Sequence, residues 1–372
     1  MNNEEKLKMS NERLAEILKS DGITNFRMTS VGNSIASGYS MVGRIIPLLY
    51  RNNSIKDVMN ENDISLDVHH FARAQNNNDE HVFEWLEGNI TEDKIFKLNR
   101  NDYGDTFLAQ PHHGLDDEKM NEYYPLDRDK YYGLKDLILE NDPNLFNTVI
   151  YNGGTGSFLD AATRGGMPYS QGVYGLVRDA SNIESSLRLI QSNNRLNGNT
   201  QVYLCGAPDY LGTKFTNLLN YRLKNISKKY ANVTYVSPAV CKVFYHSYDD
   251  PSKLAIDGHY SEDEYIEFNN NIINAINDNY RINKALIEVD RLFYSVNGFV
   301  ESSGRKIGSN DDLSDSTSKL IDKELDTLND DERIKFLKML KKYINHRTPY
   351  DYYYLSDGIK DSINKEIKAL KK

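Results

Sequence analysis

The chain has 372 residues, of which 39% are hydrophobic, 27% are charged and only 9 are proline. This composition excludes collagen-like, low-complexity and wholly disordered chains. The formal net charge of −9 repels a phosphate backbone and argues against nucleic acid as a partner. No apolar run reaches the roughly 18 residues of a membrane-spanning helix, and the polar start lacks the pattern of a secretory signal. We therefore expect a cytoplasmic protein with no membrane partner.

From the N-terminus, a polar helix through Ser20 precedes a region in which apolar, β-branched runs alternate with amphipathic helical stretches. This alternation predicts a parallel sheet with helices on both faces. The expected strands are Phe26–Val31, Ser65–Ala72, Asn147–Asn152, Gln201–Gly206 and Val233–Val236. The expected helices between them lie near Met41–Tyr50, Glu80–Leu86, Val173–Asn193 and Lys214–Tyr230. The predicted fold class is α/β, a three-layer α/β/α fold with a doubly wound five-stranded parallel sheet of the flavodoxin-like kind.

Two regions interrupt this alternation. Residues from about 89 to 143 form an insertion that is too long for an ordinary connection, and such insertions often carry lids or binding loops. From about residue 285 the sequence is helical and highly charged, which predicts a C-terminal appendage. We therefore divide the chain into an N-terminal helix (1–24), a main domain (25–284) and a helical tail (285–372). The polar tail also suggests an interface through which copies of the chain could form a homo-oligomer.

A serine follows the first expected strand. The segment Gly32-Asn33-Ser34-Ile35-Ala36-Ser37-Gly38 leads from that strand toward the next helix and places Ser34 at the carboxyl end of the sheet. Open α/β sheets bind their ligands at that edge, and a tight turn there offers backbone N–H donors to a developing oxyanion. The alternative is a serine N-cap on an ordinary turn.

A histidine stands shortly before the last helix of the main domain. In the segment Asp257-Gly258-His259-Tyr260-Ser261, His259 lies two residues before a capping box that Ser261 forms with Glu264. A histidine beside a carboxylate can take a proton from a hydroxyl group and return it to a leaving group. The alternative is a turn that carries a solvated histidine.

Together, the two segments resemble the motifs of the SGNH, or GDSL-type, serine hydrolase family. The block at 32–38 resembles the first motif of that family, with Asn33 where Asp is usual, and implies Ser34 as the nucleophile. The Asp257–His259 segment resembles the last motif and implies His259 as general base and acid, with Asp257 orienting it. Family members usually space these two residues Asp-x-x-His, so the carboxylate of Asp257 stands one residue closer here. The resemblance implies no metal and no cofactor.

The resemblance also implies an oxyanion hole, which departs from the family pattern at two positions. Gln75 stands where a glycine is usual, although its backbone N–H could still donate. Gly156 stands where the family has an asparagine, which removes a side-chain donor. The implied hole therefore consists of the backbone N–H groups of Ser34, Gln75 and Gly156. Asn152, Thr155 or one of the asparagines at 76–78 could replace the missing donor.

The remaining candidates concern substrate and metal. Asn152, Thr155 and Arg164 lie in or just after the third expected strand and are candidate substrate contacts, Arg164 as an anchoring cation. His112 and His113 lack a third ligand at a spacing typical of a metal site, so we expect no bound metal. Tyrosines concentrate in the insertion, after the third strand and in the tail, and they suit contacts with sugar rings as well as subunit contacts.

The sequence therefore predicts a serine esterase that hydrolyses small acyl esters, with acetyl groups on a carbohydrate favoured as substrate. The resemblance that carries this prediction covers roughly residues 26–279. Two alternatives stay open: an acyltransferase to a glycan hydroxyl, and a catalytically weak carbohydrate-binding or assembly protein on the same scaffold.

Overall fold

The computed structural model describes most of the helices and strands of the chain. The described residues are 2–32, 36, 48–72, 140–152, 169–208, 214–240, 244–246, 254–256, 260–303, 319–346 and 357–370. Most of the expected insertion and the break before residue 319 lie outside this part of the chain.

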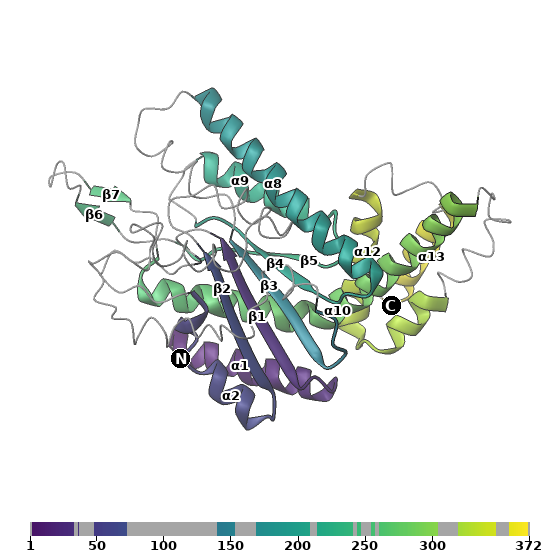
Figure 1. Cartoon of the computed structure of the whole chain (residues 1–372), viewed down its shortest axis with the longest axis horizontal. Helices are drawn as coiled ribbons and strands as arrows, with labels where there is room; N and C mark the ends of the chain where they lie inside the picture. The colour runs from purple at the N-terminus through teal and green to yellow at the C-terminus, as the bar shows by residue number, and fades with distance from the viewer. Residues whose placement is uncertain are drawn as a thin grey trace.

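A five-stranded parallel sheet forms the centre of the molecule (Figure 1). Its strands are β1 (Asn25–Gly32), β2 (Ser65–Ala72), β3 (Leu145–Asn152), β4 (Gln201–Cys205) and β5 (Val233–Val236). They pair in the order β2-β1-β3-β4-β5, and every pair is parallel. All five predicted strands are confirmed, and the strand order is that of flavodoxin-like doubly wound folds. The fold is therefore α/β, as predicted.

Helices cover both faces of this sheet. On one face lie α1 (Asn3–Ser20), the short α2 (Ile55–Glu61) and the first half of α10 (Glu262–Ser303), whose apolar side chains pack on Phe26, Met28 and Ile150. On the other face lie α8 (Tyr169–Leu196) and α9 (Lys214–Ser227), which pack on Val31, Val149 and Leu204. Alternate residues of β1, β3 and β4 thus enter two different cores. The predicted helices Val173–Asn193 and Lys214–Tyr230 are confirmed.

The other predicted helices of this region are only partly described. Residues 41–47 lie outside the described residues, and a 3-10 helix, η1 (Leu48–Arg51), comes directly after them. The helix expected near Glu80–Leu86 also lies outside the described residues. A short antiparallel hairpin of β6 (Phe244–His246) and β7 (Leu254–Ile256) precedes α10.

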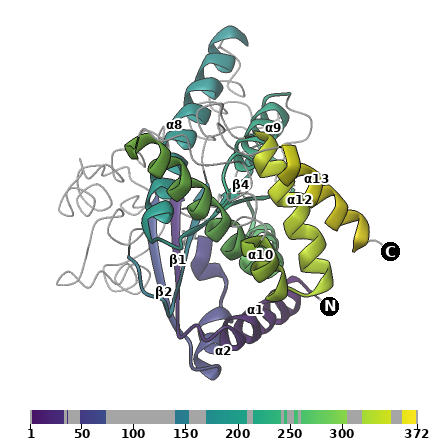
Figure 2. The same ribbon diagram turned by 90° about the vertical axis from the view of Figure 1, so that its right-hand side faces the viewer.

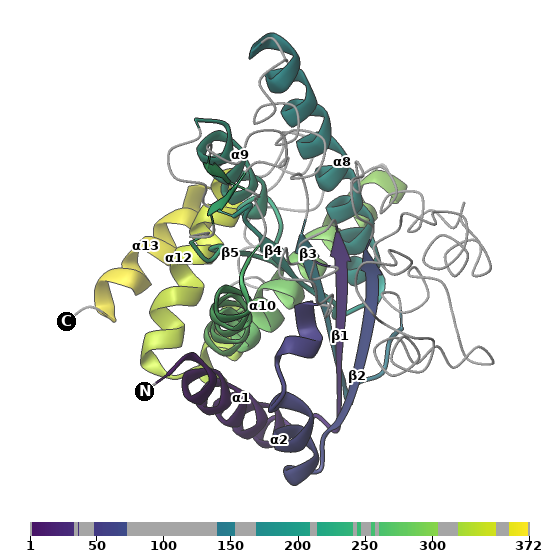
Figure 3. The same ribbon diagram turned by 90° about the vertical axis from the view of Figure 1, so that its left-hand side faces the viewer.

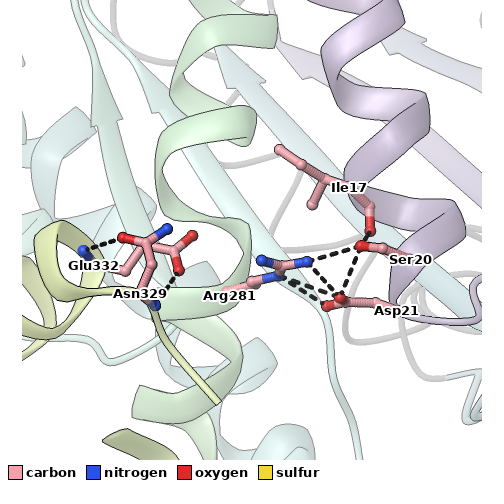
Figure 4. Close-up of polar contacts among 6 residues, drawn as sticks. All are labelled: Ile17, Ser20, Asp21, Arg281, Asn329 and Glu332. Carbon is pink, nitrogen blue, oxygen red and sulfur yellow. Dashed lines mark hydrogen bonds and ion pairs between the residues drawn. The ribbon is translucent and has the colours of Figure 1, made fainter. Parts of the chain in front are cut away.

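The N-terminal helix α1 belongs to the main body of the fold. It lies beside α10, where the hydroxyl of Ser10 contacts Asn270 and Asn274, and Nδ2 of Asn277 donates to the carbonyl of Ser10 at 2.9 Å. At the far end of the same contact, the guanidinium of Arg281 binds Asp21 (2.8 Å) and the hydroxyl of Ser20, as Figure 4 shows. Two polar helices are therefore joined by side-chain hydrogen bonds along their length.

A buried polar network fixes α10 on the sheet near the amino ends of the strands. Nδ2 of Asn283 donates to the hydroxyl of Thr234 at 2.9 Å and to Oε1 of Gln201 at 3.3 Å. Gln201 in turn donates to the carbonyl of Tyr280 at 2.9 Å and accepts from the hydroxyl of Tyr203 at 2.9 Å. Because buried polar groups are costly when unpaired, this network favours one register of the helix on the strands.

The second half of α10 extends past the sheet and holds the C-terminal helices α12 (Asp330–His346) and α13 (Asp357–Ala369). These lie on the outer side of α10, away from the strands (Figures 2 and 3), and share an apolar cluster with it. Asp290 of α10 binds Arg195 of α8 at 2.9 Å and accepts a short hydrogen bond from the hydroxyl of Tyr343. The helix α10 runs unbroken through residues 284–285, where the sequence analysis divides main domain and tail, and that division stays a prediction.

None of the described helices is both long enough and apolar enough to cross a membrane.

Candidate functional site

The strands of the sheet all end at the same level, which creates one continuous carboxyl edge. Gly32 of β1 pairs with Ala72 of β2 and with Asn152 of β3, while Cys205 of β4 pairs with Asn152 and with Val236 of β5. In this strand order the direction of winding reverses between β1 and β3. Ligands of doubly wound folds bind at the carboxyl ends of the strands beside such a reversal. The pair Gly32 and Asn152 therefore marks the candidate site.

Gly32 cannot be replaced by a larger residue without moving its neighbour. Its φ angle of +147° is one that residues with side chains rarely adopt. A Cβ atom at this position would lie 2.8 Å from Cβ of Asn152 and still closer to the Asn152 carbonyl oxygen. The chain thus leaves β1 in close contact with β3, two residues before Ser34.

The side chain of Asn152 carries a buried donor at this place. Its side chain and backbone together are only 5% exposed, and Nδ2 has no hydrogen-bond acceptor among the described residues. An unpaired buried donor costs about 1–3 kcal/mol, and a ligand oxygen that accepted its hydrogen bond would remove this cost. Its position suits donation to a ligand that enters the switch point.

The segment after Ser34 is tied to helix α10 through a single residue of η1. The backbone N–H of Leu48 donates to the carbonyl of Ala36 at 3.1 Å, and the carbonyl of Leu48 accepts from Nδ2 of Asn269 at 2.7 Å. Leu48, Ala36 and Asn269 are all buried. Ala36, two residues after Ser34, is thus linked through Leu48 to the third turn of α10.

The start of α10 is anchored directly after His259. The predicted capping box is confirmed: the N–H of Ser261 donates to Oε2 of Glu264 at 2.8 Å, and the N–H of Glu264 lies 3.4 Å from Oγ of Ser261. Tyr260 is fully buried, with its ring 5.2 Å from the rings of both Tyr265 and Phe268. Further along, Asn271 donates to the carbonyl of Ser237, just past β5, at 3.4 Å. These contacts place the beginning of α10 at the carboxyl edge of the sheet.

Only one of the predicted site residues is described. That residue is Asn152, and the structure places it at the switch point as a buried donor. The remaining predicted residues lie outside the described residues: Ser34, Asp257 and His259 of the proposed triad, Gln75 and Gly156 of the proposed oxyanion hole, and the substrate candidates Thr155 and Arg164. Described residues flank several of them, because Ser34 lies between Gly32 and Ala36, and Tyr260 directly follows His259.

A separate charged cluster lies on β1 and β2, toward the amino ends of these strands. Nε of Arg27 donates to Asp67 at 2.7 Å and its Nη1 contacts Glu140, while Nε2 of His69 lies 2.8 Å from Oδ1 of Asp67. Burial raises the pKa of Asp67, but His69 and Arg27 outweigh it and lower that pKa to about 2. The carboxylate is thus ionised and held by Arg27 and His69, so the cluster joins the two strands and the segment before β3 and offers no free base.

The described part offers neither a reactive thiol nor a metal-binding cluster. Burial raises the pKa of the Cys205 thiol far above its ordinary range, which leaves it a protonated core residue. Among the described residues, no three histidine, cysteine or acidic side chains come together as a metal site would require.

No family model, no curated protein and no solved structure matches the chain. The fold defines its class only as an α/β protein with a five-stranded parallel sheet in the strand order of doubly wound folds.

Proposed function

We propose that the chain is a serine ester hydrolase of the SGNH type. Ser34 is the nucleophile, His259 is the general base and then the general acid, and Asp257 orients His259. The observation that carries the proposal is the buried, unpaired Nδ2 of Asn152 beside Gly32 at the switch point.

Ester hydrolysis by Ser34 needs hydrogen-bond donors beside the reacting carbonyl, and Asn152 can supply one of them. As Oγ of Ser34 bonds to the ester carbonyl carbon, the carbonyl oxygen becomes an oxyanion that fixed hydrogen-bond donors must stabilise. The backbone N–H groups of Ser34, Gln75 and Gly156 are three proposed donors, and Nδ2 of Asn152 is the fourth. Asn152 thereby replaces the asparagine that the family carries at the position of Gly156.

The proton follows a closed path. His259 takes the hydroxyl proton of Ser34 and gives it to the departing alcohol, which leaves an acyl-enzyme. His259 then takes a proton from water, whose oxygen bonds to the acyl carbon, and returns it to Ser34 as the acid leaves. The hydrogen bonds from Leu48 to Ala36 and from Asn269 to Leu48 support this pairing, because they link the segment after the serine to the helix after the histidine.

We propose small acyl groups, acetyl above all, on a carbohydrate as the substrate. Thr155 and Arg164 then contact the sugar. Nothing in the sequence indicates the extended apolar channel of a lipase, and this favours a short acyl chain.

Hydrolysis of p-nitrophenyl acetate and butyrate tests the proposal, with circular dichroism to establish that each variant folds. We expect the native protein to prefer the acetate, and both Ser34→Ala and His259→Ala to lose at least about 10³-fold in kcat. Undiminished turnover by folded Ser34→Ala would refute the proposal. Absence of turnover in the native protein together with glycan binding would favour a binding protein on this scaffold.

A further inference from the structure

The 3-10 helix η1 contacts Ala36, two residues after Ser34, and helix α10, which begins three residues after His259. At its first residue, Leu48 joins the carbonyl of Ala36 to the side chain of Asn269. At its last residue, Arg51 reaches the first turn of α10. A four-residue element thus has one end beside the serine segment and the other beside the helix that follows His259.

Arg51 holds the first turn of α10 in a defined orientation. Its Nε and Nη2 atoms donate to the two carboxylate oxygens of Glu262, at 3.0 and 3.1 Å. Its guanidinium carbon lies 3.9 Å from the centre of the Tyr265 ring. The paired hydrogen bonds and the stacked ring leave the planar guanidinium little freedom to rotate. Since Glu262 is the first residue of α10, this contact fixes the chain three residues after His259.

This ion pair is a poor device for stability alone. The side chain of Arg51 is 2% exposed, whereas that of Glu262 is half exposed. Withdrawing a guanidinium from water is costly, and an apolar side chain in such a place is often as stabilising. The core beside it is already built from Leu48, Leu49 and the aromatic residues of α10. Arginine instead fixes the orientation of the first turn of α10, because its paired hydrogen bonds to Glu262 are directional.

The ion pair at the other end of the sheet provides a comparison. Arg281 of α10 also binds a carboxylate through two nitrogens, at 2.8 Å (Nη2) and 3.2 Å (Nε) from Oδ1 of Asp21, and it fastens α10 to α1 (Figure 4). Arg281 lies 19 residues, about five helical turns, further along α10 than Glu262. Arg281 therefore forms a similar two-nitrogen ion pair on the same helix, more exposed than that of Arg51 and distant from the start of α10.

We propose that η1 is a bracket that sets the distance between the serine segment and the histidine loop, with Arg51 as a positioning residue. The inference rests on the proposed function for its catalytic meaning. Loss of Arg51 removes one of the contacts that hold the first turn of α10 and leaves the Glu262 carboxylate, three residues after His259 in the sequence, without this partner. Both effects slow the chemical step, because misplacing a catalytic group by about 1 Å can cost about 10²-fold in rate.

The test compares Arg51→Met, Arg51→Lys and the matched control Arg281→Met. For p-nitrophenyl acetate we expect Arg51→Met to lose about 10- to 100-fold in kcat with KM changed less than about threefold. The acidic limb of its kcat/KM profile should move to higher pH, because the free carboxylate favours the protonated histidine. Arg51→Lys should recover part of kcat, since an ammonium group keeps the charge but loses the paired hydrogen bonds. Arg281→Met should lose stability but keep kcat and the pH profile.

Two results would overturn the bracket: full kcat with an unmoved pH profile in folded Arg51→Met, or an equal loss of kcat in Arg281→Met.

A readout independent of hydrolysis separates this failure from that of the proposed function. With Cys241→Ala as background, nitroxide labels on Ser34→Cys and His259→Cys report the distance between the two positions by the dipolar broadening of their continuous-wave electron paramagnetic resonance spectra. Strong broadening that weakens on Arg51→Met supports the bracket even if the native protein hydrolyses no ester, and unchanged broadening refutes it.

Discussion

Replacing Asn152 with leucine separates a functional donor from a structural one, because the two roles predict opposite changes in stability. Leucine is close to asparagine in shape but has no polar atom. In the folded protein Nδ2 of Asn152 is buried without an acceptor among the described residues, which costs about 1–3 kcal/mol. Replacing the amide with leucine removes this cost, whereas imperfect packing of the leucine side chain lowers the stability by up to about 1.5 kcal/mol. We expect the free energy of unfolding to stay level or to rise by about 1 kcal/mol.

The same variant should lose activity. A missing oxyanion donor costs about 10²–10³-fold in kcat, with little change in KM. The assays are urea unfolding followed by circular dichroism and the hydrolysis of p-nitrophenyl acetate. The expected result is a protein at least as stable as the native one that turns over at most about 1% as fast.

Asn147→Leu is the matched control on the same strand. Asn147 is also buried, but it lies at the other end of β3, where its Nδ2 donates to the hydroxyl of Thr200 at 3.3 Å. This variant should lose about 1–3 kcal/mol of stability and keep its kcat. If Asn152→Leu instead lost about 2 kcal/mol or more of stability, or kept native turnover, the assignment of Asn152 as a functional donor would be wrong.

Three further predictions concern described residues away from the site. Asp67→Asn should lower the free energy of unfolding by about 1 kcal/mol at pH 7, a value discounted for solvent screening of a partly exposed group. Since the folded pKa of Asp67 is about 2 and the ordinary value is 3.8, this stabilisation is present above about pH 4 and disappears toward pH 2; a difference between the two proteins that is independent of pH across this range would contradict it. Asn283→Ala should cost about 2–3 kcal/mol in urea unfolding, because it leaves the hydroxyl of Thr234 without this partner, and a loss below about 0.5 kcal/mol would show that the network is dispensable. In the folded protein at pH 8, Cys205 should resist a thiol reagent until the chain unfolds, since burial raises its pKa; rapid modification, located by peptide mass spectrometry, would argue against the described core.

The sheet could be predicted because most of its strands are short, largely apolar runs between turn residues. The central strand β3 is buried along its whole length, so a run such as Asn147-Thr148-Val149-Ile150-Tyr151 needs no alternation to be recognised. The start of α10 could be predicted equally well, since a capping box depends on two side chains three residues apart in the sequence. In both cases the signal is local.

The parts that could not be predicted depend on contacts between distant residues. Helix α1 has the sequence of a polar, exposed helix, yet Asn11 is fully buried because its amide pairs with that of Asn52 in both directions, at 2.6 and 3.0 Å. The link from Ala36 through Leu48 to Asn269 could not be predicted either. It depends on backbone groups of Ala36 and Leu48, and almost every residue type carries the same backbone groups. The length of α10 could not be predicted for a related reason, because the apolar face of its second half is buried only against the C-terminal helices.

At the candidate site the sequence indicates Asn152 as one of several possible replacements for a missing donor. It cannot choose among them, because burial and the lack of an acceptor are properties of the fold. Arg51, Leu48 and Asn269 carry no signal of their own, since each lies in a segment without a motif.

The central claim is that Ser34 is a nucleophile activated by His259, and labelling by a fluorophosphonate probe tests it most directly. Oγ of an activated serine bonds to the phosphorus atom as fluoride leaves, and peptide mass spectrometry then locates the adduct. We predict one labelled residue, Ser34, in the native protein, with labelling at least about 10²-fold slower in His259→Ala. A folded native protein that stays unlabelled, or that is labelled at another serine with an unchanged rate in His259→Ala, would contradict the account.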